Sequence, residues 1–177
     1  MVADDALIPP DVLVIPEWAG AASALEVADL VQSGIVKRVV VLAGPELPEE
    51  REFQRRGVAY EDFAAILARQ MISLGVVNPE RMPRRASGTE AEGRELAEWC
   101  AENHFRSIVV MSPPDHSRRL RRVLRRSMAR CGATVSVRVS HFAVFDPDHW
   151  WENRDALRVG LVELEKLLLD VVRHPLS

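Results

Sequence analysis

The sequence predicts an α/β fold, a three-layer Rossmann-like sandwich in which helices cover both faces of a mostly parallel central sheet. Short apolar runs such as residues 11–15, 38–43 and 107–112 alternate with longer segments of helical periodicity. Strands that are apolar on both faces and are each followed by a helix are typical of parallel sheets with right-handed crossovers. Because 177 residues suffice for one sizeable core, we expect residues 1–177 to form a single α/β domain.

The individual elements follow from apolar patterning and from glycine positions. Strands are predicted at Asp11–Ile15, Arg38–Ala43, Ser107–Ser112 and Thr134–Phe142, with a short edge segment at Arg81–Pro83. Helices are predicted at about Ala21–Ser33, Tyr60–Leu74, Thr89–Asn103, His116–Cys131 and Arg154–Val172. Three of the helices are followed by glycine, the residue that most often ends a helix. The stretch Gly44–Pro48 is rich in turn-forming residues and predicts a loop.

Charge and composition narrow the classes of partner. The net charge is −3 and the isoelectric point is about 6.0, which argues against nucleic acid as the main partner. The two cysteines, Cys100 and Cys131, form no C-x-x-C pair, so a disulfide framework is not expected. The N-terminal stretch has no basic region before its apolar run, and no apolar stretch is long enough to span a bilayer. We therefore expect a cytoplasmic protein with no membrane span.

In parallel sheets, ligands bind beyond the carboxyl ends of the strands, so the loops after the strands are the candidate sites. The loop after the first strand, Pro16–Gly20, lacks the G-x-G-x-x-G pattern of dinucleotide-binding folds. Glu17 and Trp18 in this loop would contact a ligand by charge and by stacking. The alternative is an ordinary surface turn with a partly buried indole.

Two further residues stand at the start of a predicted helix. Thr89 and Glu92 have the S/T-x-x-E spacing of a capping box, which explains both residues without a ligand. The same hydroxyl at a helix N-terminus would also bind an anion.

The stretch SPPDHSRR, residues 112–119, opens an arginine-rich helix. His116 and Arg119 lie three residues apart in its first turn and flank its apolar stripe, so they point towards the carboxyl ends of the strands. A cation at a helix N-terminus is unfavourable unless an anion lies beside it. That anion is either a ligand or Asp115, which is a candidate N-cap.

Five arginines, at positions 118, 121, 122, 125 and 126, fall on the opposite side of this helix. They form either a solvated face or a contact surface for an acidic partner or anionic lipid. The loop Phe145–Trp151 contains Asp146, Asp148 and His149, but their spacing matches no metal motif, so we expect a proline turn and no metal site. Trp150 and Trp151 either pack against the last helix or form a wall of the pocket.

Several of these sequence features occur along the chain in the order found in a known protein family. They are the strand Val39–Leu42 with Gly44, Thr89 in an S-x-T context, the pattern Ser112-x-x-x-His116-x-x-Arg119, and Trp150-Trp151 followed by Arg154, Glu163 and Lys166. In this order the chain resembles the SanA/YdcF/ElyC family of bacterial domains of unknown function, over about Asp11 to Val172. The sequence departs from the family at Pro16–Gly20, at Ala43-Gly44-Pro45 and at Asp115.

The resemblance implies a Rossmann-like fold, a link to the bacterial envelope and a pocket lined by Thr89, His116 and Arg119. One member of the family is reported to bind S-adenosylmethionine, which is therefore a possible cofactor by resemblance only. We expect a small-molecule pocket protein that binds an anionic or nucleotide-like ligand, with His116 as the candidate catalytic acid–base group. The candidate ligand-binding residues are Glu17, Trp18, Gly44, Thr89, Glu92, Ser112, Asp115, Arg119 and Trp151. The alternative is a non-catalytic interaction module that uses the basic helix Arg118–Arg126.

Overall fold

Five strands form one parallel sheet in the order β3-β2-β1-β4-β5, which confirms the predicted α/β class. The computed structural model describes residues 2–82, 88–129 and 131–175. The strands are β1 Val12–Pro16, β2 Val39–Leu42, β3 Glu80–Met82, β4 Ser107–Ser112 and β5 Thr134–Val139. The helices are α1 Gly20–Gln32, α2 Pro48–Arg55, α3 Phe63–Ser73, α4 Thr89–Glu102, α5 Pro114–Met128 and α6 Arg154–Arg173.

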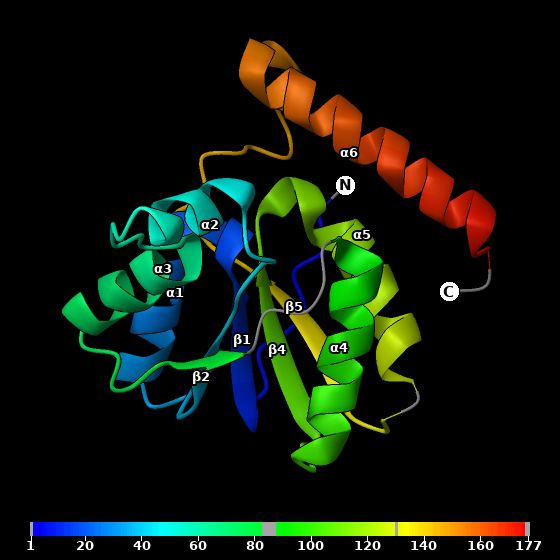
Figure 1. The fold of residues 1–177 in the computed structure, drawn as a ribbon. Coiled ribbons are helices and arrows are strands. Elements are labelled where there is room, and N and C mark those ends of the chain that lie inside the picture. The colour runs from blue at the N-terminus through cyan, green and yellow to red at the C-terminus, as the bar shows by residue number, and fades with distance from the viewer. Residues whose placement is uncertain (1, 83–87, 130, 176–177) are drawn as a thin grey trace.

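The sheet is buried on both faces, as its apolar strands require. On one face, the core combines alternate strand residues with apolar side chains of α1 and α3. On the other face, a second core combines the remaining strand residues with α4 and α5. Leu13 points into the first core and Val14 into the second, and neither is exposed to solvent. Figure 1 shows the resulting three layers.

The strand order places the topological switch point between β1 and β4. The chain moves outward from β1 to β2 and β3 on one side, and then returns to β4 and β5 on the other. At such a point the loops that follow the two central strands diverge and leave a crevice. The loop after β1 carries Glu17 and Trp18, and β4 leads directly into α5 with His116 and Arg119.

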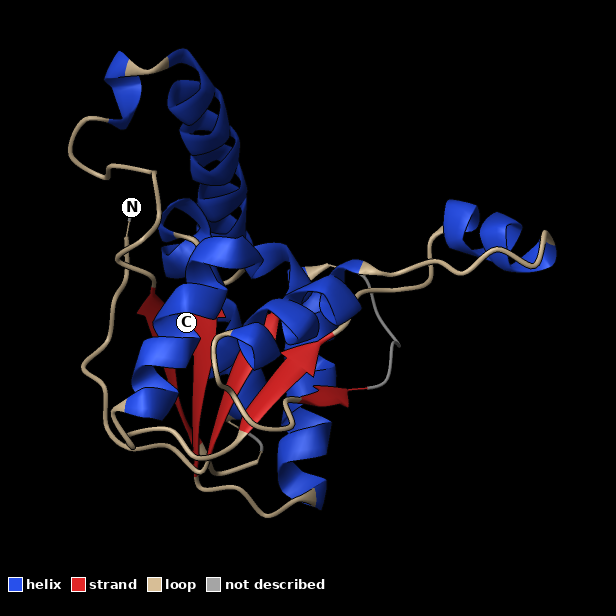
Figure 2. Cartoon of the chain, turned by 90° about the vertical axis from the view of Figure 1, so that its left-hand side faces the viewer, coloured by secondary structure: helices blue, strands red, loops and turns tan. Residues whose placement is uncertain are grey.

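Helix α2 was not predicted, because its eight residues contain one apolar aromatic side chain and no apolar stripe. Its stabilising features are local. Pro48 occupies the first turn, Glu49 and Glu50 face the positive end of the helix dipole, and Glu52 pairs with Arg55. The helix projects away from the sheet in Figure 2.

Several boundaries differ from the predicted ones for local reasons. Helix α5 begins at Pro114 rather than His116, because proline is favoured in the first turn. Strand β5 ends at Val139 rather than Phe142, since Ser140 donates a hydrogen bond to the carbonyl of Ala22 and turns the chain. The predicted edge segment becomes β3, and Pro83 lies outside the described residues.

Helix α6 lies beyond the carboxyl edge of the sheet and packs on α5 and on the short 3-10 turn Trp150–Glu152 (Figure 1). Trp150 lies flat against Gly160, where a Cβ atom would come within 2.4 Å of the indole. The buried residues of α6 are Gly160, Glu163 and Asp170. Its large apolar side chains are largely exposed, among them Leu161, Leu168 and Val172. No helix in the described part of the chain is long and apolar enough to cross a membrane.

Candidate functional site

A buried carboxylate, Glu163 of α6, is the centre of a polar network at the switch point. His116 Nδ1 lies 2.9 Å from Glu163 Oε2, and Arg119 Nε donates to the same oxygen at 3.0 Å. Lys166 Nζ donates to Glu163 Oε1 at 2.7 Å. One carboxylate therefore accepts hydrogen bonds from three nitrogen-bearing side chains.

Arg119 links this network to the start of α4. Its Nη1 donates to Thr89 Oγ1 at 3.1 Å. The predicted capping box is wrong: the N-cap residue is Gly88, which has φ 90° and makes no side-chain cap, and the Thr89 hydroxyl accepts from Arg119 instead. Thr89 is the first residue of the helix rather than its cap, so its side chain is free to face α5.

Trp18 covers the network on the side of the β1 loop. Its indole Nε1 lies 3.3 Å from both carboxylate oxygens of Glu92, and its ring meets the imidazole of His116 edge-on, with centroids 4.9 Å apart. Glu92 thus binds Trp18 rather than the helix N-terminus. As a result, His116 is 7% exposed, with Trp18 against one edge and Glu163 at its Nδ1.

Gly44 is the position that lets Glu17 enter the site. A Cβ atom at Gly44 would lie 2.1 Å from Glu17 Oε1, so any other residue would push the carboxylate away. The second oxygen, Glu17 Oε2, is buried and has no hydrogen-bond partner among the described residues. An unsatisfied buried carboxylate oxygen is costly, and this carboxylate is close enough to Glu92 for its charge to raise the pKa of Glu92.

The electrostatics of the carboxylates differ sharply. Burial acts to raise the pKa of Glu163, but hydrogen bonds from His116, Arg119 and Lys166 outweigh it and hold the pKa well below its usual range. Burial raises the pKa of Glu92; the Trp18 hydrogen bond opposes this effect and the charge of Glu17 adds to it. Glu163 is therefore a fixed anion, whereas Glu92 holds a proton more readily than an exposed glutamate.

The hydrogen bond to Glu163 also determines the tautomer of His116. A carboxylate oxygen with a lowered pKa only accepts, so Nδ1 must carry the hydrogen. Arg119 Nη2 lies 2.9 Å from the same Nδ1 and donates to Glu163 Oε1 at 3.4 Å, so both donors converge on the carboxylate. In the neutral imidazole this leaves Nε2 as the proton acceptor, the arrangement in which a carboxylate orients a general base.

Two open cavities adjoin the network on the side of α6. One, of about 390 Å³, is lined by Asp115, Asp155, Arg158, Val159, Val162, Glu163 and Lys166. The other, of about 400 Å³, shares Asp115, Asp155 and Val159 with it and adds the aromatic rings of Phe145 and Trp150. Both volumes lie in the range of small-molecule sites. Glu163 thus separates the His116–Arg119 pair from a cavity that also contains Arg158 and Lys166.

The remaining predicted site residues lie in different surroundings. The Ser112 hydroxyl is fully buried and donates to the carbonyl of Pro113. Asp115 is not the N-cap of α5, since that residue is Pro113; it lines both cavities instead. Burial, together with the nearby charge of Glu163, raises the pKa of Asp115. Trp151 is 55% exposed; its ring lies tilted against His149 and edge-on to Trp150, outside the network.

Four of the five arginines on the far side of α5 pair with carboxylates of this chain. The solvated-face alternative is wrong for Arg121, Arg122 and Arg126, whereas Arg118 and Arg125 are exposed as that alternative expects. Arg122 and Arg126 both pair with Asp170 of α6, at 2.7 and 2.8 Å. Arg121 and Arg125 pair with Asp5. Glu163 and Asp170 lie seven residues apart, as do Arg119 and Arg126, so α6 runs alongside α5 in the same direction.

One group of potential metal ligands occurs in the described part of the chain. Glu90, Asp170 and His174 present ligand atoms within 4.8 Å of one another. Arg126 pairs with both Glu90 and Asp170, and Arg122 also pairs with Asp170, so two guanidinium charges already balance the two carboxylates. In the loop after β5, Asp146 accepts from the backbone of Asp148 and pairs with His149.

The sequence patterns named Glu163 and Lys166 only as part of the family resemblance and assigned neither residue to the site. They gave no indication of Asp155 or Arg158. Glu163 is 47 positions from His116 in the chain. A usable signal existed in α6, where Gly160, Glu163 and Asp170 share one face. Acidic residues in line with a glycine, on a helix whose other positions are largely apolar, indicate a helix that buries its charged side.

Comparison with known proteins gives no independent assignment: no family model, no curated protein and no solved structure matches this chain. The resemblance to the SanA/YdcF/ElyC family stays a prediction.

Proposed function

We propose that this protein binds a small anionic or nucleotide-like ligand at the carboxyl edge of its sheet, in the manner expected of a SanA/YdcF/ElyC-like domain. The observation that supports the proposal best is the convergence of Thr89, His116, Arg119 and Glu163 beside two cavities at the switch point. These residues come from three helices that are distant in the sequence.

The cavity walls favour a ligand with an anionic group and an apolar or aromatic part. Arg158 and Lys166 supply donors for a carboxylate or phosphate. Val159, Phe145 and Trp150 supply an apolar wall on which a planar ring would pack. Burial raises the pKa of Asp115, which lines both cavities.

His116 is the acid–base group that this site offers to a reaction. Glu163 holds Nδ1 through a hydrogen bond, so Nε2 is the ring nitrogen that can accept a proton from a substrate. Trp18 packs against the ring and His116 is 7% exposed, so access of a substrate to the imidazole requires movement of the side chains that cover it. S-adenosylmethionine is a candidate ligand through the resemblance alone, because the loop after β1 lacks the usual glycine pattern.

The alternative, an interaction module that uses the basic side of α5, has less support. Four of its five arginines are engaged by Asp5 and Asp170 on the same chain. An anionic partner would have to displace these intramolecular carboxylates.

A thermal-shift screen tests the proposed function, with nucleotides, S-adenosylmethionine, sugar nucleotides, sugar phosphates and polyprenyl phosphates as probes. A ligand at one hundred times its dissociation constant stabilises the protein by about 2.7 kcal/mol. Lys166→Ala should weaken binding of the active compound by about tenfold, corresponding to the loss of one charged hydrogen bond. Arg154→Ala, on the same helix but outside both cavities, is the matched control and should bind as the wild type does. The proposal fails if no compound shifts the transition or if both variants bind equally well.

A further inference from the structure

We propose that Cys131 is a thiol-exchange site that reacts with a small zwitterionic disulfide and then forms an intramolecular disulfide with Cys100. The site lies in a cavity between α4 and α5, on the face of the sheet opposite α1 and α3 and away from the His116 network. Nothing in the proposed ligand-binding function depends on it.

The two cysteines are neighbours with different access to solvent. Both are free thiols; Cys100 is completely buried, and Cys131 is half-buried. Cys131 packs against the apolar core that contains Cys100 and lines one cavity with Ala97 and Ala101, the neighbours of Cys100 on α4. Contact with Cys131 is one cause of the raised pKa of Cys100. Sulfurs in such contact need only a small further approach to reach the bonded distance of about 2.05 Å.

The helix ends around the two thiols allow that approach. Cys100 lies in the last turn of α4, which ends at Glu102, and Cys131 follows the end of α5 at Met128. The thiols now donate weak hydrogen bonds to the carbonyls of Phe105 and Met128, at 3.6 and 3.1 Å. Neither residue is held in the middle of a regular helix, so a small shift of the backbone disrupts few hydrogen bonds.

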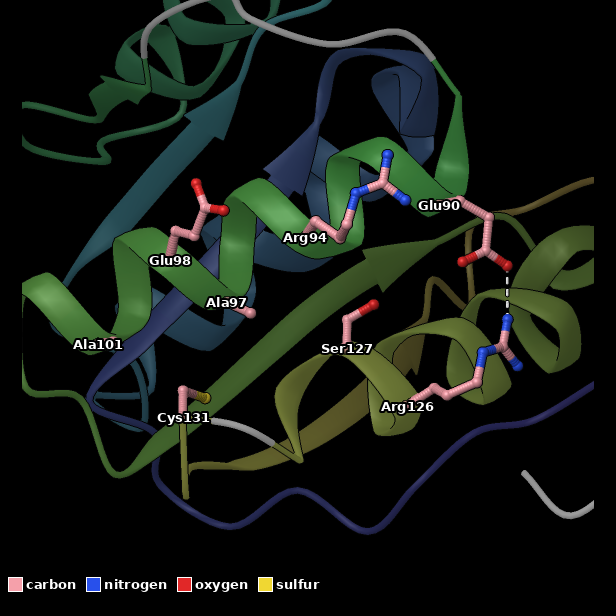
Figure 3. Close-up of a pocket in the computed structure, with 8 residues that line it drawn as sticks. All are labelled: Glu90, Arg94, Ala97, Glu98, Ala101, Arg126, Ser127 and Cys131. Atoms are coloured by element: carbon pink, nitrogen blue, oxygen red, sulfur yellow. Dashed lines mark hydrogen bonds and ion pairs between the residues drawn. The ribbon is translucent and has the colours of Figure 1, made fainter. Parts of the chain in front are cut away.

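A cavity of about 380 Å³ gives a reagent access to Cys131 (Figure 3), whereas Cys100 is fully buried and does not line it. Its lining includes Cys131, Ser127, Arg94, Arg126, Glu90 and Glu98. In Figure 3, α4 and α5 form its two sides and Cys131 lies at one end. Arg126 and Glu90 pair with each other in this lining, and Arg94 and Glu98 add one charge of each sign, so the cavity complements a molecule that carries both carboxylates and an ammonium group. Oxidised glutathione is a disulfide of this class.

The exchange balances in two steps. The Cys131 thiolate, after loss of its proton to water, attacks one sulfur of the small disulfide and releases one small thiolate, which leaves a mixed disulfide on Cys131. The Cys100 thiolate then attacks the Cys131 sulfur and releases the second small thiolate. The protein loses two thiol hydrogens, and the small disulfide is reduced to two thiols.

The environment of the two thiols determines the order of these steps. Burial and the contact with Cys131 raise the pKa of Cys100 to about 12, so Cys100 remains a thiol at neutral pH and cannot make the first attack. Ring closure is therefore the slow step, and its rate should increase with pH. The mixed disulfide on Cys131 should accumulate before the internal disulfide forms.

The test incubates the full native chain with oxidised glutathione and follows intact mass and non-reducing peptide maps. The expected wild-type product has lost two hydrogens and contains a peptide in which Cys100 is joined to Cys131. Cys100→Ser should stop at one glutathione adduct on Cys131, and Cys131→Ser should stay unmodified while folded. The proposal is overturned if the wild type never yields the joined peptide, or if Cys131→Ser reacts as fast as Cys100→Ser.

A second comparison isolates the role of the charged cavity. Arg94→Gln should slow adduct formation with oxidised glutathione about two- to fivefold, the range expected for one partly exposed charge contact. It should leave the rate with neutral hydroxyethyl disulfide unchanged. Arg118→Gln, an exposed arginine outside the cavity, serves as the matched control. Equal slowing with both reagents would overturn the assignment of the zwitterionic class.

Discussion

The helices of this protein attach to it in two contrasting ways. Helices α1, α3, α4 and α5 bury apolar side chains against the sheet, in two separate cores. Helix α6 attaches to α5 through buried carboxylates, Glu163 and Asp170, which bind side chains of α5. Apolar packing is tolerant of direction, whereas ion pairs require particular partners. The contrast indicates that the sheet layers provide stability and that α6 provides the geometry of the site.

The largest effect on the free energy of unfolding is expected in the apolar core that packs against the sheet. Leu13→Ala removes a fully buried side chain of β1 and should lower the free energy of unfolding by about 2–5 kcal/mol. Leu168→Ala, at a position of α6 that is 57% exposed, should change it by no more than about 0.5 kcal/mol. Urea unfolding of both variants measures the difference. Comparable losses would show that α6 is packed by apolar contacts after all.

A smaller loss of stability, local to α6 and the start of α5, is expected when the buried carboxylate loses its charge. Glu163→Gln keeps the volume but removes the charge that pairs with Arg119, and should destabilise the protein by about 1.5–3 kcal/mol. Hydrogen exchange should increase in α6 and in the first turn of α5, while β1 and β4 keep their protection. Glu165→Gln, on the exposed side of α6, is the control. Uniform loss of protection across the sheet would contradict the separation of roles.

The stabilisation that Glu163 provides should depend on pH. Its pKa in the folded state lies below the ordinary value of 4.5, so the unfolded chain binds the proton more tightly. Stability from this group is complete above about pH 4.5 and is lost as the pH falls towards the folded-state pKa. The difference in unfolding free energy between wild type and Glu163→Gln should therefore shrink between pH 6 and pH 3. A difference that stays constant would exclude the ion pairs as its source.

The smallest effect on the free energy of unfolding is expected at Thr89. It distinguishes a residue that caps α4 from one that links α4 to α5. Thr89→Ala should cost about 0.5–1.5 kcal/mol, the usual contribution of one hydrogen bond. Because the hydroxyl accepts from Arg119, this cost should largely disappear in the Arg119→Ala background. A cost that persists in the double variant would restore the capping interpretation.

Local patterns allowed most of the fold to be predicted from the sequence. The strand Ser107–Ser112 was predicted with its exact bounds, because every residue after the first is buried. Helix α2 was missed, because a helix that packs against no core has no apolar periodicity. The expectation of a single domain, the cytoplasmic location and the family resemblance stay predictions.

The layers of this protein follow from local sequence patterns, since apolar strands and amphipathic helices have no stable arrangement other than stacking on one another. The position of His116 and Arg119 at the carboxyl edge follows as well, because helix geometry orients the first turn of α5. The partners of these two residues depend on how the helices pack. Glu163, Thr89 and Trp18 are separated from them by tens of residues, and a polar contact at that separation leaves no periodic trace in the chain. The same reason explains why Arg121, Arg122 and Arg126 lie against Asp5 and Asp170 and are partly withdrawn from solvent.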